Sequence, residues 1–405
     1  MRIFCAVRHS IEPRKFYGEL WSGNFYPALR ELGYEIIESH VDLYPLSRFM
    51  SVPGDFTKEE LAMRAEITQR IIDEVRAAHH QRPIDLFLSY FYNAHFDPAG
   101  FDELRQFRIP TVNFYCNSIY QFEKVSEIAA CADFSWHPEK NARELYLGVG
   151  ANPVRVQLGA DPNLYHPLVG VERKRAACFI GQRYADRDRW LADLHNANVP
   201  CDVYGSGWNN AAEIAEDFSA PDKVYLGRKQ YRPASLASYA RAVRENIEQE
   251  GLFGGLSRTA KQWQYRRETQ RLMPAIIAHA KGRAEDISTT FAAYEVCLNF
   301  SNVWSDGRPG SKLIPHVRLR DFEGPMSRTC YLTGHTDEIG EFYEVGKEIE
   351  TYRTANELIE KTRFYLDHPE SAERLRSAGY ARAKRDHTWQ KRFQELFDRI
   401  GLRKS

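Results

Sequence analysis

The sequence lacks a long hydrophobic run and a net charge, and both absences limit what the protein can be. Nowhere in its 405 residues is there an apolar stretch of the roughly 18 residues that a membrane-spanning helix needs, so we expect no span and leave peripheral attachment open. The N-terminal sequence MRIFCAVRHS is too short and too charged for a signal peptide. The 55 basic and 55 acidic residues cancel, which argues against long-range attraction to nucleic acid or anionic membrane, while a local basic pocket stays open.

The sequence also lacks the cysteine spacing of a metal or redox centre. There is no CxxC and no Cys/His metal pattern. Several cysteines lie inside apolar runs such as VNFYCNS and EVCLNF, which predicts buried, reduced thiols and fits a cytoplasmic location. The seven cysteines are Cys5, Cys116, Cys131, Cys178, Cys201, Cys297 and Cys330.

The chain is long for a single core, so two domains are expected, and its first third alternates strands with helices. This alternation is typical of an α/β fold with a parallel, doubly wound sheet, in which ligands bind at the carboxyl ends of the strands. The expected strands cover residues 2–7, 34–39, 84–91, 110–116, 132–136 and 152–158, and the expected helices cover about 24–32, 58–79, 99–107, 121–131 and 139–147.

A segment with two prolines and a glycine, LGADPNLYHPL, interrupts this alternation at residues 158–168 and is typical of an interdomain linker. A second strand–helix series begins at residue 175 and resumes at residue 294, after a charged stretch that we interpret as a helical insertion over about 210–290. We therefore predict an N-terminal domain over 1–165, a C-terminal domain over 169–385 and a final helical segment over 386–405.

Several segments together resemble one family. In the second half they are FIGQRYADRDRWL, DVYGSGW, LNFSN, VRLRDFEGPMS, YLTGHTDEIGEFYEVGKEIETYRTANELIEKTRFYLDHPE and AGYARAKRDHTW; in the first half they are FYGELWSGNFYPALRELGYEII and VQLGADPNLYHP. The chain resembles the GT-B glycosyltransferases, more narrowly the "glycosyl transferases group 1" branch with the CgeB-like spore-maturation proteins. The resemblance implies two Rossmann-like domains facing across a cleft. The C-terminal domain would bind a nucleotide sugar, the N-terminal domain would receive the acceptor, and the last helix would cross back to the N-terminal domain.

Glu323 is the expected anchor of the donor. It falls within a charged amphipathic helix beside Arg318 and Arg320, and a carboxylate can accept hydrogen bonds from both hydroxyls of a ribose. By resemblance it matches the second glutamate of the family's paired motif, whereas the first position falls on Pro315. The alternative is that Glu323 only pairs with Arg320 on a solvated helix face, which would contribute little stability.

A cluster of basic residues is expected to contact the diphosphate of the donor. Negative charge builds on that leaving group as the glycosidic bond breaks, so positive charge beside it favours the reaction. Gly181, Tyr184 and Arg187 match the G-x-x-Y-x-x-R pattern of the family. For any single basic residue, ordinary surface charge is the alternative. The candidates are Arg183, Arg187, Lys312, Arg318 and Arg320, of which Arg187 and Arg320 are favoured as catalytic.

Two further segments supply candidate donor contacts. DVYGSGW ends a strand with two glycines and an indole, so Gly205 and Trp208 are candidates for contact with a nucleobase, although an ordinary tight turn explains the glycines equally well. Asn302 lies in the segment 301–311 after a core strand and should line the same site. Asp186 and Asp188 form a DxD pattern at the start of a helix, where acids favour the dipole, and we expect no metal there.

In the first domain, Gly18, Trp21 and Gly23 follow the first strand and mark the expected acceptor side, with Trp21 either an acceptor platform or a core residue. His95 and Asn117 lie just past strand ends and are the catalytic candidates of this domain. An inverting transferase needs a base, which suits histidine but not asparagine. A hydrogen-bonded loop histidine is the alternative for His95.

The helix at 261–281 interleaves Trp263 and Tyr265 with arginines, a pattern that can indicate nucleic-acid binding. With zero net charge, a solvated helix that packs its apolar face fits better, and acceptor docking stays open.

These features predict a metal-independent glycosyltransferase that moves a sugar from a nucleotide-diphosphate donor to an unidentified acceptor. No further cofactor and no nucleic-acid partner are expected. Two alternatives stay open: a nucleotide-sugar epimerase on the same fold, which needs no acceptor, and a non-catalytic GT-B-like binding protein, which the missing first glutamate keeps open.

Overall fold

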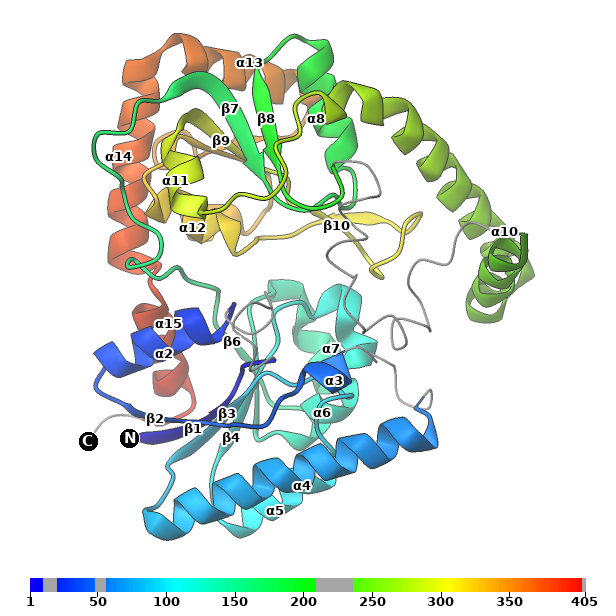
Figure 1. Cartoon of the computed structure of the whole chain (residues 1–405), viewed down its shortest axis with the longest axis vertical. Helices are drawn as coiled ribbons and strands as arrows, with labels where there is room; N and C mark the ends of the chain where they lie inside the picture. Colours follow the sequence, from blue (N-terminus) through cyan, green and yellow to red (C-terminus); the bar gives the residue numbers. More distant parts are fainter. Residues whose placement is uncertain (10–19, 48–55, 209–235, 403–405) are drawn as a thin grey trace. The chain divides into compact units, whose positions relative to one another are not determined.

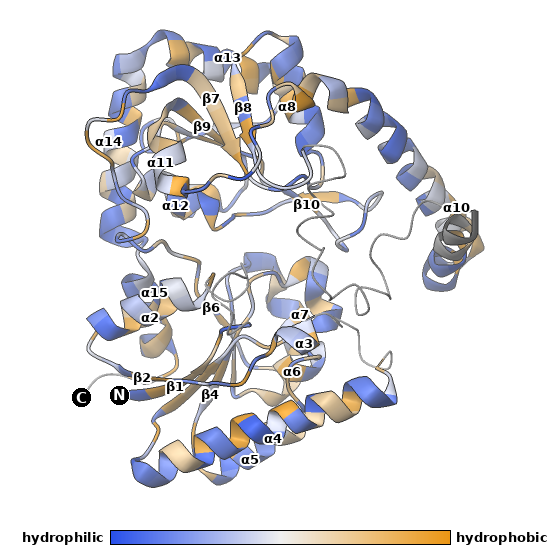
Figure 2. Cartoon of the chain, viewed as in Figure 1, coloured by the Kyte–Doolittle hydropathy of each residue, from blue (hydrophilic) through white to orange (hydrophobic). Residues whose placement is uncertain are grey.

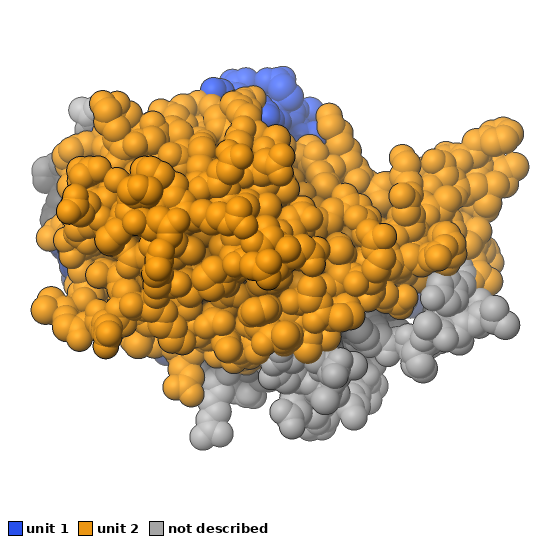
Figure 3. Space-filling model, turned by 90° about the horizontal axis from the view of Figure 1, so that it is seen from above, with its two compact units in different colours: residues 1–161, 388–405 blue, residues 162–387 orange. Residues whose placement is uncertain are grey.

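The computed structural model describes residues 1–9, 20–47, 56–208 and 236–402 (Figure 1). The chain divides into two compact units, which Figure 3 shows in different colours. Unit 1 comprises residues 1–161 together with 388–405, and unit 2 comprises residues 162–387. Gly18, a predicted acceptor residue, lies outside the described residues.

Unit 1 is built on a parallel sheet whose described strands run in the order β2-β1-β3-β4-β5-β6. Strands β3 and β4 are buried along their whole length, which explains their apolar sequences LFLS and TVNF. The strands are β1 (Arg2–Ala6), β2 (Glu35–Glu38), β3 (Leu86–Ser89), β4 (Thr111–Phe114), β5 (Phe134–His137) and β6 (Pro153–Arg155). The helices are α2 (Ser22–Glu31), α3 (Tyr44–Ser47), α4 (Lys58–Gln81), α5 (Ala99–Gln106), α6 (Ser126–Cys131) and α7 (Arg143–Gly148), with 3-10 turns η1 (Ile119–Lys124) and η2 (Lys140–Ala142).

The last helix of the chain, α15 (Trp389–Arg399), completes the core of unit 1. Thr388 caps it by accepting a hydrogen bond from the Lys391 amide. The Trp389 side chain is fully buried, and its Nε1 donates to Asn24 Oδ1 over 3.0 Å. Its indole also packs on Phe25, with ring centroids 4.9 Å apart. A residue near the C-terminus is thus part of the core of the N-terminal sheet.

Unit 2 has a second parallel sheet, in the order β13-β12-β9-β7-β8, and an antiparallel hairpin of β10 and β11. Apolar residues dominate the central strands (Figure 2). The strands are β7 (Lys174–Ile180), β8 (Cys201–Tyr204), β9 (Tyr294–Asn299), β10 (Asn302–Trp304), β11 (Leu313–Pro315), β12 (Tyr331–Gly334) and β13 (Glu350–Tyr352). The helices are α8 (Arg187–Asn196), α10 (Leu236–Ile277), α11 (Ile287–Ala292), α12 (Arg320–Met326), α13 (Ala355–Asp367) and α14 (Pro369–Asp386), with the 3-10 turn η5 (Ile339–Glu341).

Helix α10 lies where the helical insertion was predicted. It is interrupted at Gly251, whose backbone has φ 73° and ψ 174°, so it consists of two helical segments joined at a corner. The second segment packs against α8: Tyr265 Oη donates to the Ala185 carbonyl over 2.8 Å, and Thr269 Oγ1 donates to Asp188 Oδ2 over 2.7 Å. Among the described helices, none is long and apolar enough to cross a bilayer.

Candidate functional site

In the unit 2 sheet, the direction in which successive strands are added reverses between β7 and β9. From β7 the chain continues through α8 to β8 on one side, and β9 is followed by β12 and β13 on the other. In open parallel sheets, ligands bind at the carboxyl ends of the strands beside such a switch point. The residues that follow β7 and β9 are therefore the natural site residues of unit 2, and they include Arg187 and Asn302.

Arg187 is the first residue of α8 and is buried, with 7% of its surface exposed. Its Nη1 donates to the Gln182 carbonyl over 2.7 Å, and its guanidinium lies 5.3 Å from the centroid of the Phe179 ring. The pKa of Arg187 is lowered to about 9, mainly by burial and also by the positive charges of Arg318 and Arg320, while Asp186 opposes the shift. The structure thus holds a cation where both burial and like charges disfavour it.

Arg318, just before α12, faces the same region. Its Nη2 donates to the Asn302 carbonyl over 3.2 Å. The Nε atoms of Arg187 and Arg318 are both buried and have no hydrogen-bond partner among the described residues. Within the same part of the chain, neither guanidinium forms a salt bridge with a carboxylate. Two cations with unused donors are the signature of a site for an anion.

Arg320 and Glu323 form an ion pair one turn apart on α12, with Arg320 Nη1 and Glu323 Oε2 separated by 2.6 Å. Glu323 therefore does pair with Arg320, as the alternative from the sequence required. The helix face that carries the pair is not solvated, however, because only 3% of the Glu323 side chain is exposed. Burial alone would lower the pKa of Arg320, but the Glu323 carboxylate raises it overall. Glu323 Oε1 makes no hydrogen bond to any described residue.

Asp321 is a candidate positioning residue that the sequence reasoning did not single out. It is 1% exposed and its Oδ2 accepts from the Arg318 backbone amide over 2.6 Å. Its Oδ1 accepts from the side chains of Asn299, Tyr331 and Thr333. Burial raises the pKa of Asp321, although these hydrogen bonds oppose the shift. The carboxylate ties the loop carrying Arg318 to β9 and β12. The available signal was an acid in the first turn of a helix, three residues after Arg318.

The two acids of the DxD pattern are both used within the protein. Asp186 Oδ2 accepts from Trp190 Nε1 over 3.0 Å and from Asn302 Nδ2 over 2.7 Å. Asp188 accepts from Thr269 and lies 3.8 Å from Arg183 Nη2. These contacts place Asn302 beside the arginines and fix Arg183 at their edge. The described residues contain no cluster of three or more His, Cys, Asp or Glu side chains suited to a metal ion.

Gly205 and Trp208 take part in packing inside unit 2. Gly205 has φ 123°, and a Cβ atom there would lie 2.4 Å from the Gly181 carbonyl oxygen, so contact between two loops already requires glycine. Trp208 is fully buried and its Nε1 donates to the same carbonyl over 2.7 Å. Lys312, in contrast, is exposed just before β11.

A cavity of about 200 Å³ opens at the carboxyl ends of β9, β12 and β13. Asn302 belongs both to this cavity and to the surroundings of Arg318, so the two features are continuous. Aromatic walls with a few polar groups are typical of small-molecule sites. The lining residues are Trp190, Phe300, Ser301, Asn302, Pro315, Gly334, His335, Tyr352 and Arg353.

In unit 1, His95 is fully buried in the turn after β3, and both ring nitrogens are engaged. Nδ1 accepts from the Tyr92 amide over 2.9 Å, so Nε2 carries the proton and faces Ser47 Oγ at 3.0 Å. In this arrangement no lone pair of the ring is available to take a proton. Asn117 is half-buried just past β4.

His9, which sequence reasoning did not single out, lies past the end of β1 with its ring 4.6 Å from that of His95. Its place after the first strand was the signal that could have found it. On the expected acceptor side, Trp21 is buried against Phe114, with ring centroids 4.7 Å apart, and Gly23 lies in α2. Trp21 therefore occupies the core in this structure, which was one of its two expected placements.

Comparison with known proteins agrees with this geometry. Residues 241–398, from α10 to α15, match the family model described as "Glycosyl transferase-like". No curated protein matches the chain by sequence. The fold is similar to that of sucrose-phosphate synthase from Thermosynechococcus elongatus, at 12% identity over 99% of both chains with a TM-score of 0.54.

Two further solved structures are similar along nearly the whole chain. Anabaena Alr3699/HepE in complex with UDP has 12% identity over 99% of both chains and a TM-score of 0.53. AviGT4, a glycosyltransferase involved in avilamycin A biosynthesis, has 13% identity over 98% of both chains and a TM-score of 0.51. The chain thus has the GT-B fold that its sequence predicted, and its residues 241–398 are similar to a glycosyl transferase family. Its narrower placement among the CgeB-like proteins stays a prediction.

Proposed function

We propose that unit 2 binds a nucleotide-diphosphate sugar at the carboxyl edge of its sheet and that the protein transfers the sugar to an acceptor without a metal ion. The observation that carries the proposal is the incompletely neutralised group of Arg187, Arg318 and Arg320 at the switch point. A diphosphate would neutralise these cations and accept from their unused N–H groups. Anabaena Alr3699/HepE, which has a similar fold, binds UDP and UDP-glucose.

Each residue has a distinct part in the proposed reaction. Arg187 and Arg318 hold the phosphates, and their charge stabilises the diphosphate as the glycosidic bond breaks and the leaving group becomes more negative. Glu323 orients Arg320 and offers its Oε1 to a ribose hydroxyl. Asp321 positions Arg318 through its backbone amide. Because these groups are prearranged by buried contacts, little reorganisation is needed when the donor binds.

Metal independence follows in this proposal from the charge of the arginines, which supplies what a divalent cation supplies elsewhere. The acids nearest to the arginines, Asp186 and Asp188, are held by Trp190, Asn302 and Thr269. The acceptor is assigned to unit 1, where His95 and Asn117 stay the catalytic predictions. For His95 to act as a base, its ring must first give up its hydrogen bonds to Tyr92 and Ser47.

The proposal is tested first by donor binding. A thermal-shift screen with UDP, GDP, ADP, CMP and dTDP compounds should identify the base, because a ligand that binds the folded state raises its melting temperature. With that nucleotide, Glu323→Gln should bind about tenfold more weakly, the usual consequence of losing one charged hydrogen bond. Glu360→Gln, at an exposed position on α13, is the matched control and should bind like the wild type.

The outcome separates the three expected functions. Formation of an epimerised sugar from donor alone, without acceptor, would identify an epimerase and contradict sugar transfer. If no nucleoside diphosphate shifts the melting temperature, the protein is a GT-B-like binder of something else. Donor hydrolysis or transfer that persists in EDTA supports the metal-independent reaction, and strict dependence on an added divalent cation contradicts it.

A further inference from the structure

The corner of helix α10 exposes large apolar side chains that nothing in the proposed donor site uses. Phe253 is 86% exposed, Leu252 is 57% exposed and Leu256 is 49% exposed. They follow the Gly251 break, at the start of the second helical segment. Trp263 follows two turns later at 56% exposure. Contiguous exposed apolar groups of this size mark interaction sites, whereas single ones carry no such meaning.

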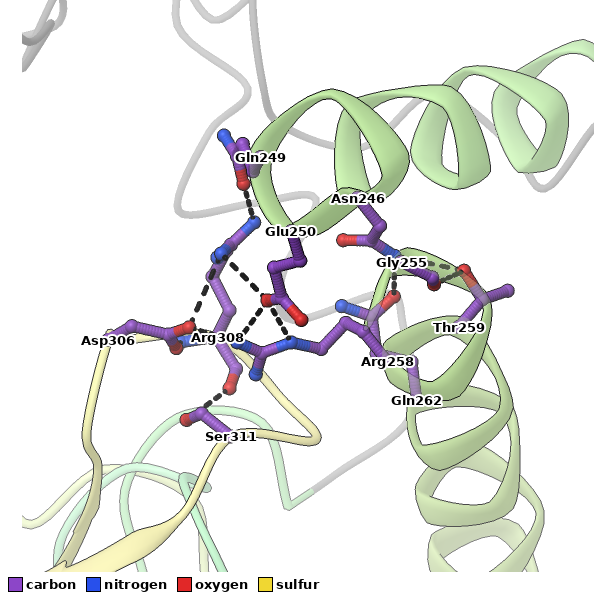
Figure 4. Close-up of polar contacts among 10 residues, drawn as sticks. All are labelled: Asn246, Gln249, Glu250, Gly255, Arg258, Thr259, Gln262, Asp306, Arg308 and Ser311. Atoms are coloured by element: carbon purple, nitrogen blue, oxygen red, sulfur yellow. Dashed lines mark hydrogen bonds and ion pairs between the residues drawn. The ribbon is translucent and has the colours of Figure 1, made fainter. Parts of the chain in front are cut away.

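Polar contacts join the two helical segments at the corner (Figure 4). Arg258, from the second segment, donates to Glu250 at the end of the first over 2.7 Å and also pairs with Asp306 of the β10–β11 hairpin. Behind them, the buried Asn246 donates to Thr259 and Gln262 over 3.1 and 3.2 Å. The exposed apolar groups therefore lie on a preformed structure, and binding through them needs little ordering of the corner.

Gly255 sets how closely the two segments cross. A Cβ atom at this position would lie 2.5 Å from the Ile247 backbone, so glycine is required for the contact. The inner face of the second segment is fixed to unit 2 through Tyr265, Thr269 and the fully buried Ile276. The opposite face points outward, and in Figures 1 and 3 this part of unit 2 projects from the rest of the unit.

The outward face changes from apolar to basic along the helix. Phe253, Leu256, Ala260 and Trp263 recur at intervals of three and four residues and thus lie on one side, and Arg267 and Arg271 continue the same stripe. The Arg267 guanidinium lies 4.8 Å from the centroid of the Trp263 ring. Between residues 252 and 277 the only acid is Glu268, which pairs with Arg189 of α8 over 2.5 Å. The exposed basic residues of the segment are Lys261, Arg266, Arg267 and Arg271.

We propose that this corner and the basic stripe beside it form a docking surface for an anionic lipid bilayer. Phe253, Leu252 and Leu256 would enter the interfacial region, Trp263 would lie at its boundary, and the stripe would contact the headgroups. A second copy of the chain fits the surface less well, because a symmetric contact would bring the same cations against one another. The attraction is local and short-ranged, in keeping with a net charge of 0.

The test is flotation of the whole protein with vesicles of phosphatidylcholine, with and without phosphatidylglycerol. Wild-type protein should float only with the anionic vesicles. Phe253→Ser should lower the vesicle partition coefficient about tenfold, because one exposed phenyl group no longer leaves water. Arg267→Glu with Arg271→Glu should lower it by at least tenfold, because each reversal loses one attraction and adds one repulsion. Phe364→Ser, at an exposed phenylalanine of α13, is the control and should float like the wild type.

These variants should keep the melting temperature and the nucleotide-induced shift of the wild type, since the substituted residues are exposed and outside the donor site. Failure of the membrane-docking proposal can therefore be distinguished from failure of the proposed donor binding. Equal flotation of wild type and Phe253→Ser, or equal flotation with neutral and anionic vesicles, would overturn the proposal. So would a wild-type dimer that Phe253→Ser converts to a monomer in analytical ultracentrifugation, which would assign the surface to a second copy.

Discussion

At the scale of single residues, Arg187 shows how function and stability can oppose each other. The guanidinium is buried and lies near two other cations, and burial together with these charges brings its pKa to about 9. A buried charge without a carboxylate partner destabilises a fold, whereas an apolar side chain of similar length does not. The proposed diphosphate ligand would supply the missing negative charge at this position.

We predict that Arg187→Met has opposite effects on the stability of the unliganded protein and on its affinity for nucleotide. The melting temperature of the unliganded variant should equal or exceed that of the wild type, while affinity for the donor nucleotide should fall by about 10- to 100-fold, the loss of a charged hydrogen bond or two. Thermal melting with and without nucleotide measures both. Arg189→Met, whose side chain pairs with Glu268 at the surface, is the control and should leave nucleotide affinity unchanged. A variant that melts lower and still binds normally would mean that Arg187 has only a structural role.

The sequence singled out Arg187, Arg318, Arg320 and Glu323 because charged residues near strand ends are informative even without coordinates. It could not show that the Arg320–Glu323 face is buried, since i,i+3 spacing is the same on a buried and on a solvated helix. Nor could it separate Trp208 as a core residue from Trp208 as a ligand platform. That distinction depends on a hydrogen bond to Gly181, 27 residues away.

At the scale of elements, most strands and helices follow the expected ranges, because parallel strands with both faces covered have continuous apolar sequences. The hairpin of β10 and β11 is an exception, since it was expected only as a loop lining the site. Its strands are only three residues long, which is too short to carry a periodic signal. The hairpin is defined by tertiary contacts, including the pair between Asp306 and Arg258 of α10.

The corner of α10 provides a prediction at this scale. Gly255→Ala should open the crossing of the two helical segments, because the added methyl group overlaps the Ile247 backbone. We expect destabilisation of about 1–3 kcal/mol, the usual cost of forcing an added group into a packed contact, together with faster proteolysis within α10. Urea unfolding and limited proteolysis test this. Gly23→Ala, for which no atom lies within 4 Å of the added Cβ, is the matched helical control and should not destabilise.

At the scale of the whole molecule, buried neutral histidines make both units sensitive to acid. In unit 1, burial lowers the pKa of His9 and of His137 to about 4, and Arg155 and Arg143 assist at His137. In unit 2, burial lowers the pKa of His316 to about 3, assisted by Arg318. The unfolded chain takes up these protons near pH 6.5 and the folded protein does not, so stability is complete above pH 6.5 and declines as pH falls toward 4.

One substitution tests this linkage. For each such histidine the stability lost between pH 6.5 and pH 5 is about 2 kcal/mol. His137→Gln cannot be protonated, so its free energy of unfolding should fall by about 2 kcal/mol less than that of the wild type between pH 7.5 and pH 5. Urea unfolding at the two pH values measures the difference. His368→Gln, at an exposed position, serves as control, and equal pH dependence in all three proteins would refute the explanation.

The fold class of the molecule was predictable because strands alternate with helices along most of the chain and the second half carries family motifs. The assignment of Trp389 to the core of unit 1 was implied only by the family resemblance, since nothing local in TWQKRFQELF indicates a partner at Asn24, 365 residues away. Long-range packing of this kind depends on how side chains distant in the sequence fit together, and a single sequence does not show this fit.

The central claim is that the arginines of unit 2 bind the diphosphate of a nucleotide. Isothermal titration calorimetry of the preferred nucleoside diphosphate and of the matching monophosphate, with wild type and with Arg187→Met/Arg320→Met, tests it most directly. The account predicts that wild type binds the diphosphate at least tenfold more tightly than the monophosphate, and that the double variant loses this preference. Equal affinity of the wild type for the two nucleotides, or an unchanged preference in the double variant, would contradict it.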